Sequence, residues 1–572
     1  MTAGPSVRLV ELRVLEGPNI YFPRPAVKLT IGVPGWLSAS EARAADLGSR
    51  LKVRGTIGPG EPGSEQRRRF VARVAVHVIR ALARASLSGL AVRGRPGHEL
   101  DEVVVAFPWR RRDAAIALGE ESVELLRRLL TAKRPPRELF KQSAARIVSV
   151  EPGPGPTLAK PKIPVLAVTG TNGKTTTVRL LAHLLESSGL SVAYTTTDGV
   201  YHGGKLVEEG DYSGPAGAAQ ALEQPGVKAV VLEVARGGIL LKGIGTPHLD
   251  VAVVTNISAD HLGLLGVFTL DQLAEVKAAI TRIVKPGGWS VLNADDPRVI
   301  GMIRTAKGRP FVFSTDPDHP AIRSALNERG RALASLDRWL VLMRPRRPFQ
   351  PLLPLEEIPV TLAGISSQQL QNAMAAAAAA LGVGLSPEEV IEGLRTFVLD
   401  PERNPGRANL FELDGRVVVI DYAHNEAGME GLIEICRGLR AEGNDIWLAY
   451  GTAGDRSDEV VHGMGYLAAR GADHVTIVEL RRYLRGRDPQ DLIERLRAGA
   501  ADGGADPEKV PDFETEIEGL DWMLERSRPG DVVAITALAQ RPEIFTLMDE
   551  RGASRVSPER CRELAARARP DA

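Results

Sequence analysis

A glycine-rich stretch followed by a lysine and threonines is the part of the sequence best suited to chemistry. Residues 168–181 read VTGTNGKTTTVRLL, in which an apolar run ends at Val168 and a helical pattern begins after Gly173. Backbone N–H groups of a tight glycine turn and of a helix N-terminus attract an anion. The Lys174 ammonium would meet the outer phosphates of a nucleotide, and the Thr175 hydroxyl would contact Mg²⁺. The stretch therefore predicts a triphosphate-binding loop of the short GTNGKT kind, although it does not name a reaction.

Polar side chains follow several of the apolar strands behind this loop. Glu233 ends an apolar run in VVLEVARGG, and Asp260 and His261 follow another in TNISADHLG. Lys277 lies on the next helical segment, and Asp295–Asp296 follow a further strand. Ligands of open α/β sheets collect where the carboxyl ends of the strands meet, so these residues predict metal or phosphate chemistry. Each alone also fits a structural role: a surface acid, a loop histidine, a solvated lysine, or a turn former or helix cap.

The elements that must position these residues predict an α/β protein. Strand and helix patterns alternate from residue 164 onward, and near-continuous apolar strands are typical of a parallel sheet covered on both faces. The pattern restarts near residue 404 with RVVVIDYAHN, which indicates a second, Rossmann-like α/β unit. Residues 1–150, which precede a proline-rich linker, mix strands and helices as a small α+β domain does. We therefore expect three domains, at 1–158, 159–403 and 404–572.

Composition excludes several classes of protein. The 572 residues include 72 Lys plus Arg against 71 Asp plus Glu, so no net field attracts nucleic acid or an anionic membrane. Cys436 and Cys561 are far apart, which argues against a disulfide framework or a thiolate metal site. No basic-then-apolar leader opens the sequence, and the alanine-rich run at 373–385 is too short to span a bilayer, so it predicts a packed core helix. We expect a cytoplasmic protein with no nucleic-acid or membrane partner, ending in a frayed helix at 558–572.

Taken in order, these motifs resemble the Mur ligase superfamily, and within it the cyanophycin synthetases. The matching sequence motifs are VTGTNGKTTT, TTTDGVY, GDYSGPAGA, LEVARGGIL, TNISADHLG, VLNADDP, NPGR and DYAHN. The resemblance covers roughly 160–572, and LEGPNIYF at 15–22 more weakly resembles the start of the synthetases' N-terminal domain. The synthetases carry an ATP-grasp domain before their Mur-like half, whereas residue 150 here runs almost directly into that half. The resemblance implies a central P-loop Mur ligase domain followed by a Rossmann-like C-terminal domain.

The resemblance further implies an ADP-forming ligase that joins a carboxylate to an amine. The carboxylate would attack the γ-phosphate of ATP to form an acyl phosphate, from which the amine would displace phosphate. The implied cofactors are ATP and Mg²⁺, and the implied substrates are a small-molecule or peptide carboxylate and an amino acid or other amine. Whether the chain acts as a homo-oligomer or with a partner enzyme is left open. The alternatives are a polyglutamate- or peptidoglycan-type ligase and a P-loop NTPase that serves as a scaffold.

The resemblance also implies roles for individual residues. The catalytic residues would be Lys174, Glu233, His261 and Lys277. The nucleotide would be held by Gly170, Thr171, Asn172, Gly173, Lys174, Thr175, Thr176, Asn372, Arg407 and Asp421. Metal ions would be held by Thr175, Glu233, His261 and Lys277, the lysine being converted by CO₂ to a carbamate. Arg407 and Asp421 would close over the nucleotide with their domain, as lids do to exclude water.

Arginine-rich stretches mark candidate substrate contacts. The segment VELRRYLRGRDP at 478–489 places Arg481, Arg482 and Tyr483 where the cyanophycin synthetases present an acidic residue suited to an arginine substrate. Arginines favour bidentate contacts with carboxylates, so this segment favours a carboxylate-bearing substrate unless it is only a solvated basic loop. The candidate substrate residues are His424, Arg456, Arg481, Arg485 and Arg487. The arginines of the helical stretch 65–86 could likewise cradle an acidic polymer or simply form a solvated face.

Overall fold

The computed structural model describes residues 7–53, 58–131, 135–158, 160–260 and 262–568. By its internal packing the chain divides into two units. One unit comprises Met1–Lys162, Gly214–Ala219 and Ala235–Pro247, and the other comprises Ile163–Ser213, Gln220–Val234 and His248–Ala572. The described residues form sheets of four, eleven and seven strands, which follow one another along the sequence. The predicted α/β class is confirmed, whereas the finer division into domains at 158 and 403 remains a prediction.

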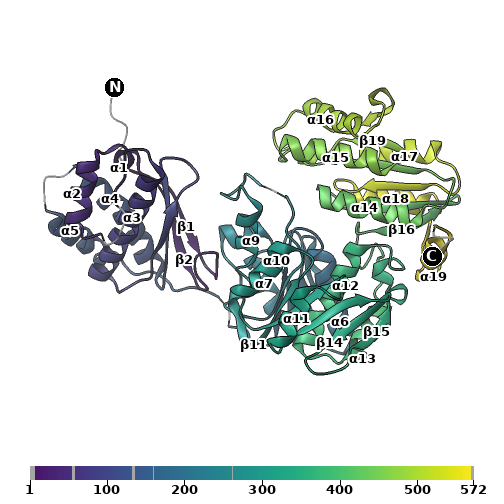
Figure 1. Cartoon of the computed structure of the whole chain (residues 1–572), viewed down its shortest axis with the longest axis horizontal. Coiled ribbons are helices and arrows are strands. Elements are labelled where there is room, and N and C mark those ends of the chain that lie inside the picture. The colour runs from purple at the N-terminus through teal and green to yellow at the C-terminus, as the bar shows by residue number, and fades with distance from the viewer. Residues whose placement is uncertain (1–6, 54–57, 132–134, 159, 261, 569–572) are drawn as a thin grey trace. The chain divides into compact units, whose positions relative to one another are not determined.

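The first sheet is antiparallel and carries helices on one face (Figure 1). Its strands, in spatial order, are β1 (Arg8–Leu15), β2 (Ala26–Gly32), β4 (Glu102–Pro108) and β3 (Arg93–Pro96). The helices are α1 (Pro34–Ser38), α2 (Glu41–Arg50), α3 (Glu65–Ser86), α4 (Arg112–Thr131) and α5 (Pro136–Val148). The Ser64 hydroxyl caps α3 by accepting from the amide of Arg67, and the apolar face of α3 packs on β3 and β4.

Three of the arginines in α3 are structural. Arg67 is fully buried, and its guanidinium donates to the carbonyls of Ala39 and Gly60, each at 2.6 Å. Arg68 and Arg69 form ion pairs with Glu65 one turn away. These three side chains are therefore engaged within the domain, which leaves the arginines of the later turns as the candidates for contact with an acidic polymer.

The central sheet places the predicted loop in its middle. Its strands, in spatial order, are β15 (Gln350–Pro354), β14 (Trp339–Met343), β13 (Arg331–Leu336), β12 (Arg309–Ser314), β11 (Val284–Asn293), β10 (Leu249–Val254), β5 (Val165–Thr169), β9 (Ala229–Glu233), β6 (Val192–Thr195), β7 (Gly199–His202) and β8 (Lys205–Glu209). Strand β5 pairs in parallel with β9 and β10, and β5 and β9 are fully buried. The predicted parallel pairing is confirmed for the centre of the sheet, where the carboxyl ends of these three strands meet at one edge. Both edges are antiparallel, through β13, β14 and β15 on one side and β6, β7 and β8 on the other.

Helices lie between or after these strands in the sequence, and the first of them begins at the loop. They are α6 (Lys174–Ser187), α7 (Pro215–Leu222), α8 (Arg236–Leu241), α9 (Leu270–Lys277), α10 (Pro297–Gly301), α11 (Pro320–Asn327), α12 (Ser367–Val383) and α13 (Pro387–Thr396). Helix α12 packs against α6 and over β10, β11 and β12. Its residues 373–380 are fully buried, because alanine and one methionine leave room for close approach of the neighbouring elements. The predicted core helix is confirmed.

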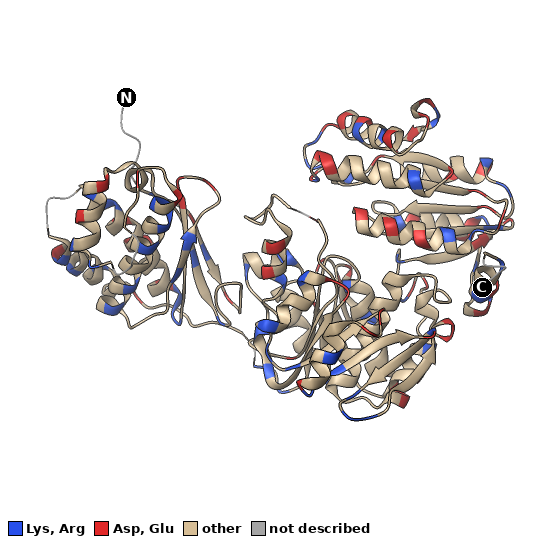
Figure 2. Cartoon of the chain, in the orientation of Figure 1, with Lys and Arg blue, Asp and Glu red and all other residues tan. Residues whose placement is uncertain are grey.

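The third sheet has the parallel centre of a Rossmann-like domain. Its strands, in spatial order, are β20 (Asp512–Phe513), β19 (His474–Val478), β18 (Ile446–Tyr450), β21 (Val532–Thr536), β17 (Arg416–Asp421), β16 (Asn409–Leu413) and β22 (Ser554–Arg555). Its helices are α14 (Glu426–Leu439), α15 (Asp458–Gly471), α16 (Pro489–Asp502), α17 (Glu516–Arg526), α18 (Arg541–Glu550) and α19 (Pro558–Ala568). In Figure 2 the acidic (red) and basic (blue) residues are interspersed along these helices. The expectation of a frayed C-terminal helix was wrong, because α19 packs on α14 and buries Cys561 and Leu564.

The cysteines and the helices agree with the composition. Cys436 and Cys561 are both buried and free, and burial raises the pKa of each thiol to about 12. At that pKa both thiols stay protonated at neutral pH, so they serve as small apolar side chains rather than nucleophiles. No helix in the described part of the chain is long and apolar enough to cross a membrane.

Glu186 of α6 generates a prediction about stability and pH. Burial raises the pKa of its carboxyl to about 7, and its Oε1 has no hydrogen-bond partner among the described residues. Because the folded chain binds a proton that the unfolded chain releases near pH 4.5, stability falls as pH rises from about 4.5 to about 7. We expect Glu186→Gln to stabilise the protein at pH 8 by roughly 1–3 kcal/mol and by much less at pH 5, as measured by thermal unfolding. Glu209→Gln, on the exposed β8, is the control, and an equal effect of Glu186→Gln at both pH values would contradict the account.

Candidate nucleotide and metal site

The loop between β5 and α6 is held by the segment that follows β10. The carbonyl of Asn256 accepts from the amide of Thr171 at 2.9 Å, and its side-chain Oδ1 accepts from the amide of Asn172 at 2.8 Å. The amide of Ser258 donates to the hydroxyl of Thr171 at 3.0 Å. These contacts fix the conformation of the loop before any ligand binds, so its remaining N–H groups can face an anion without rearrangement.

Gly173 and Asn372 fit together beneath the loop. Gly173 has a φ of 80°, and a Cβ built there would lie 2.0 Å from Oδ1 of Asn372. A side chain at this position would therefore be both strained and blocked. The Asn372 amide donates to Gln369 at 3.0 Å, and its Oδ1 accepts from the hydroxyl of Thr177 at 3.4 Å. Asn372 thus supports the loop from α12, and its predicted position near an adenine remains a prediction.

Thr175, in the first turn of α6, meets Glu233, the last residue of β9. The Thr175 hydroxyl donates to Oε2 of Glu233 at 2.9 Å, and both side chains are buried. Oε1 of Glu233 is also buried and has no hydrogen-bond partner among the described residues. Burial raises the pKa of Glu233, and the nearby positive charge of Lys174 opposes that rise. A buried carboxylate oxygen without a partner, next to a hydroxyl, fits a hard divalent cation, which prefers oxygen ligands.

Two lysines contact the loop from opposite ends. The Lys174 ammonium folds back on the carbonyl of Thr171 at 2.8 Å. Lys277, at the end of α9, is buried and donates to the carbonyl of Gly170 at 2.6 Å. His261, the remaining predicted metal ligand, lies outside the described residues. The described residues contain no cluster of three or more His, Cys, Asp or Glu that could hold a metal. Besides Glu233, the described members of the predicted metal set are therefore Thr175 and a modified Lys277.

The aspartates after β11 have structural roles. The Asp296 carboxylate caps α10 by accepting from the amides of Arg298 at 2.8 Å and Val299 at 3.1 Å. Its second oxygen accepts from the amide of Ile257 at 2.6 Å. Asp295 accepts from the backbone and hydroxyl of Thr315. The helix-cap interpretation that the sequence left open accounts for Asp296, whose bond with Ile257 also steadies the segment that holds the loop.

The C-terminal sheet brings side chains to the same loop. Asn425 and Asn172 exchange two side-chain hydrogen bonds, each of 3.0 Å. Asn404 donates to the hydroxyl of Thr176 at 3.2 Å. These bonds join the loop and the first turn of α6 to the polypeptide on either side of β16 and β17, so the loop is contacted from both sheets.

Arg407 and Asp421 lie beside each other at this junction. The guanidinium carbon of Arg407 lies 4.1 Å from the ring centroid of Tyr422, and Oδ2 of Asp421 accepts from the amide of Ala408 at 2.8 Å. Burial raises the pKa of Asp421, and the positive charge of Arg407 opposes the rise. Arg407 opposes the rise in the pKa of Glu233 in the same way, so its charge reaches the candidate metal site.

His424 and Arg456 meet at Asp260. Nη2 of Arg456 lies 3.0 Å from Oδ1 of Asp260, and Nε2 of His424 lies 3.9 Å from Oδ2. Burial lowers the pKa of His424 to about 4, so the imidazole is neutral at pH 7. Two of the five candidate substrate residues are therefore brought together at Asp260.

The arginines of 478–489 are engaged with acidic residues and backbone of the same chain. Nη1 of Arg485 donates to Asp455 at 2.7 Å, and Asp455 also faces Arg456 at 3.7 Å. Nη1 of Arg487 donates to the carbonyl of Arg456 at 3.1 Å. Arg481 instead pairs with nearby glutamates and is exposed. Arg485 and Arg487 are thus linked through Asp455 and Arg456 to Asp260. The described ion pairs of Arg481 are instead with Glu479 and Glu514.

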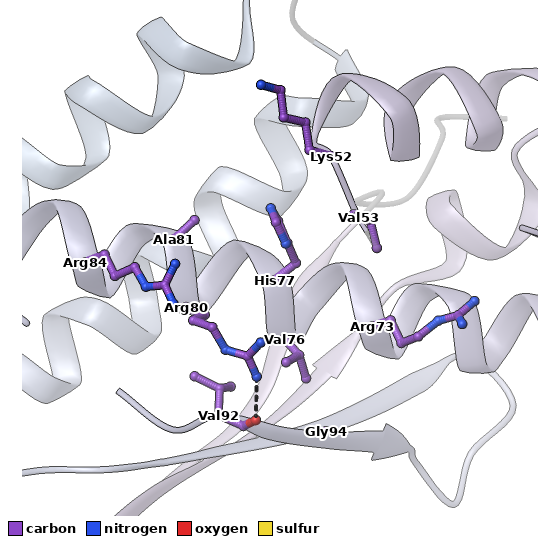
Figure 3. A pocket seen from close by; sticks show the side chains of 10 residues that line it. All are labelled: Lys52, Val53, Arg73, Val76, His77, Arg80, Ala81, Arg84, Val92 and Gly94. Atoms are coloured by element: carbon purple, nitrogen blue, oxygen red, sulfur yellow. Dashed lines mark hydrogen bonds between the residues drawn. The ribbon is translucent and has the colours of Figure 1, made fainter. Parts of the chain in front are cut away.

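The later arginines of α3 line a groove of about 650 Å³ in the N-terminal unit (Figure 3). Arg73, His77, Arg80 and Arg84 recur every three or four residues and so share one face of the helix, with Lys52 on the neighbouring loop. No acidic side chain is among the described residues that line the groove. Burial and then the charges of Arg80 and Arg84 lower the pKa of His77. The groove is therefore positively charged.

Sequence reasoning missed several residues that hold the site together. Asn256 was not identified because an asparagine after a strand has many structural uses. Asn425 and Asp198 lie within the motifs DYAHN and TTTDGVY, which were identified from the sequence. Their contacts could not be predicted from these motifs, because the partner residues are distant in the sequence.

Comparison with known proteins agrees with this geometry. Residues 168–380 match the Mur ligase middle domain, and residues 406–538 match the Mur ligase glutamate ligase domain. The chain is 37% identical over 380 residues to the cyanophycin synthetase of Crocosphaera subtropica, covering 65% of this chain and 42% of that protein. It is 40% identical over 337 residues to the cyanophycin synthetase of Synechocystis sp., covering 58% of this chain and 38% of that protein.

A solved structure shows the same fold. The bifunctional folylpolyglutamate synthase/dihydrofolate synthase with Mn, AMPPNP and L-glutamate bound matches 68% of this chain and 91% of that chain, with a TM-score of 0.51 and 19% identity. This chain spans about two fifths of the length of the cyanophycin synthetases that it matches. Because the two matching domain models together span more than half of its residues, the chain belongs to the Mur ligase family.

Proposed function

We propose that the chain is an ATP-dependent amide ligase that activates a carboxylate as an acyl phosphate and joins it to an amino acid or another amine. The observation that carries the proposal is the buried, unpartnered oxygen of Glu233 beside the Thr175 hydroxyl, at the end of a phosphate-binding loop. The similarity to cyanophycin synthetases supports this ligase type over a polyglutamate- or peptidoglycan-type ligase.

The residues at the loop fit a Mg²⁺ ion. Thr175 and Glu233 would supply two oxygen ligands, and His261 together with a carbamate on Lys277 would extend the set to a second ion. The related folylpolyglutamate synthase structure contains Mn and AMPPNP, which supports a divalent ion and a nucleotide here. When bound, the ion neutralises phosphate charge and favours attack at the γ-phosphorus.

The loop and Arg407 would serve the first chemical step. An oxygen of the acceptor carboxylate attacks the γ-phosphorus, the bond to the β-γ bridging oxygen breaks, and ADP leaves. Lys174 would exchange the carbonyl of Thr171 for phosphate oxygens, and the loop amides would hold the same oxygens. Arg407, whose charge reaches Glu233, would add positive charge from the C-terminal sheet. The loop backbone is already held by Asn256, so Lys174 is the loop side chain that must move to meet the phosphate.

The cluster at Asp260 would receive the amine. The amine nitrogen attacks the acyl carbon, phosphate leaves with the electron pair of the C–O bond, and the nitrogen loses a proton. Asp260 can attract an ammonium group, and Arg456 with Arg485 can hold the carboxylate of an incoming amino acid. His424 is neutral at pH 7 and can accept a hydrogen bond from the amine. This arrangement suits an amino acid as the incoming amine.

The groove on α3 favours an acceptor that carries several carboxylates. Arg80 and Arg84 form no ion pair with a described acidic residue, in contrast to Arg68 and Arg69 of the same helix. Guanidinium groups without such ion pairs, in a groove of about 650 Å³, can bind carboxylates along an extended acidic chain. We therefore propose an acidic peptide or poly-amino acid as the acceptor class.

A screen of phosphate release tests the ligase proposal. With ATP and Mg²⁺ present, amino acids are crossed against acidic peptides and small carboxylates, and fast phosphate release is expected only when both an amine and a carboxylate are supplied. Lys174→Ala should lower the rate by about 10²–10³-fold, because it removes a charge aimed at the transferred phosphoryl group. Lys205→Ala, on the exposed β8, should leave the rate unchanged. Equal release with ATP alone would indicate an NTPase scaffold instead.

Replacement of Glu233 should separate function from stability. Glu233→Gln keeps the shape of the side chain and removes a buried charge that lacks a full set of partners. We expect the nucleotide-free variant to unfold at a temperature equal to or above that of the unsubstituted protein, since burying such a charge is costly. It should also lose Mg²⁺-dependent phosphate release and the stabilisation by Mg²⁺ and AMPPNP seen in thermal unfolding. Stabilisation by Mg²⁺ and AMPPNP that equals that of the unsubstituted protein would rule Glu233 out as a metal ligand.

The groove can be tested through the choice of acceptor. The double variant Arg80→Gln/Arg84→Gln should raise the KM for a long acidic peptide by about tenfold, since charge-assisted contacts are lost, while the KM for a dipeptide stays unchanged. Arg69→Gln, on an exposed turn of the same helix, is the matched control. Equal changes for long and short acceptors would show that the groove does not bind the acceptor.

A further inference from the structure

The carboxylate of Asp198 lies between two arginines, one from helix α6 and one from helix α18. Nη2 of Arg179, on α6, donates to Oδ2 at 3.0 Å, and Nη2 of Arg541, at the start of α18, donates to Oδ1 at 2.9 Å. The side chain of Arg179 is 2% exposed and that of Asp198 is 18% exposed. Burial alone would raise the pKa of Asp198, but the guanidinium groups of Arg541 and Arg179 hold it below its usual range. The aspartate is therefore charged and bridges both cations.

Both arginines also hold the segment that leads to Arg407. Nη1 of Arg179 donates to the carbonyl of Arg403 at 3.1 Å, and Nη1 of Arg541 donates to the carbonyl of Pro405 at 3.3 Å. Gly406 has a φ of 67°, and a Cβ built there would lie 2.5 Å from Cδ of Arg541. The glycine thus permits Arg541 to cross the chain immediately before Arg407. Each guanidinium uses one nitrogen for Asp198 and the other for this segment.

We infer that Arg541, through Asp198 and Pro405, is a positioning residue that sets the guanidinium of Arg407 toward the nucleotide. The inference rests on the proposed function in one respect, namely that Arg407 contacts the phosphates. Helix α6 begins at Lys174 of the loop and carries Arg179, so the Asp198 bridge ties the loop's helix to the segment before Arg407. A lysine could not replace Arg541, because its single ammonium lacks the planar fork that reaches both oxygen atoms.

Binding and hydrogen exchange of the full chain test the inference. The probe is AMPPNP with Mg²⁺, whose affinity is measured by calorimetry, while amide exchange is followed in residues 403–408. Arg541→Gln and Arg541→Lys should each weaken AMPPNP binding by about tenfold and speed exchange in this segment. Arg555→Gln is the matched control, because Arg555 forms an exposed ion pair with Glu402, the residue just before this segment. The control should change affinity by less than about twofold.

A double-variant cycle distinguishes positioning from a general structural role. In an Arg407→Ala background, Arg541→Gln should weaken AMPPNP binding by less than about twofold further, because its effect passes through Arg407. The same tenfold loss in both backgrounds, or unchanged exchange of residues 403–408, would overturn the inference. If Arg541→Gln does not fold, Asp198→Asn supplies the same comparison from the other side of the bridge. Neither AMPPNP affinity nor amide exchange requires the ligase reaction. If both change as expected but the protein forms no amide bond, the proposed function is contradicted and the inference about Arg541 is not.

Discussion

The buried carboxylate of Glu233 is the constraint on which the site depends. One of its oxygens takes the hydroxyl of Thr175 and the other has no hydrogen-bond partner among the described residues. Burying a charged carboxylate costs several kcal/mol unless a cation or hydrogen-bond donors compensate. A buried glutamate at this position therefore indicates a binding site for a cation. The parallel strands β5, β9 and β10 put that site at the end of the phosphate-binding loop. A metal ion between the carboxylate and a phosphate would satisfy all of these groups at once.

The second sheet completes the site through contacts with the loop and with α6. Asn425 pairs with Asn172, and Asn404 with Thr176, so the nucleotide loop is held by residues more than two hundred positions away. Arg407 carries positive charge to the same region, and the Asp198 bridge fixes the segment before it. The contacts with the loop itself are hydrogen bonds, while apolar residues around both sheets share one core cluster. Binding and chemistry are thereby coupled to the contact between the two sheets.

The sequence predicted the parts of this arrangement that depend on local pattern. The loop, the parallel strands and the alanine-rich helix each follow from spacing and side-chain size, and Thr175 and Glu233 do meet as their positions at the loop and at a strand end indicated. Asn256 and the Arg179–Asp198–Arg541 bridge could not be predicted, because long-range pairing decides them and residue type does not. For Asp296 the sequence left both a ligand and a helix cap open, and the structure shows the cap. The packing of α19 against α14 likewise depends on tertiary contacts, which the polar composition of residues 558–572 did not indicate.

Transfer of oxygen from the acceptor to phosphate tests the central claim most directly. The acceptor identified by the phosphate-release screen is labelled with ¹⁸O in its carboxylate, and the released phosphate is examined by mass spectrometry after turnover with ATP, Mg²⁺ and the amine. If the carboxylate is activated as an acyl phosphate, each phosphate released carries one ¹⁸O atom from the acceptor. Phosphate that contains no label from the acceptor, and gains its oxygen from ¹⁸O-labelled water instead, would show that the nucleotide is only hydrolysed.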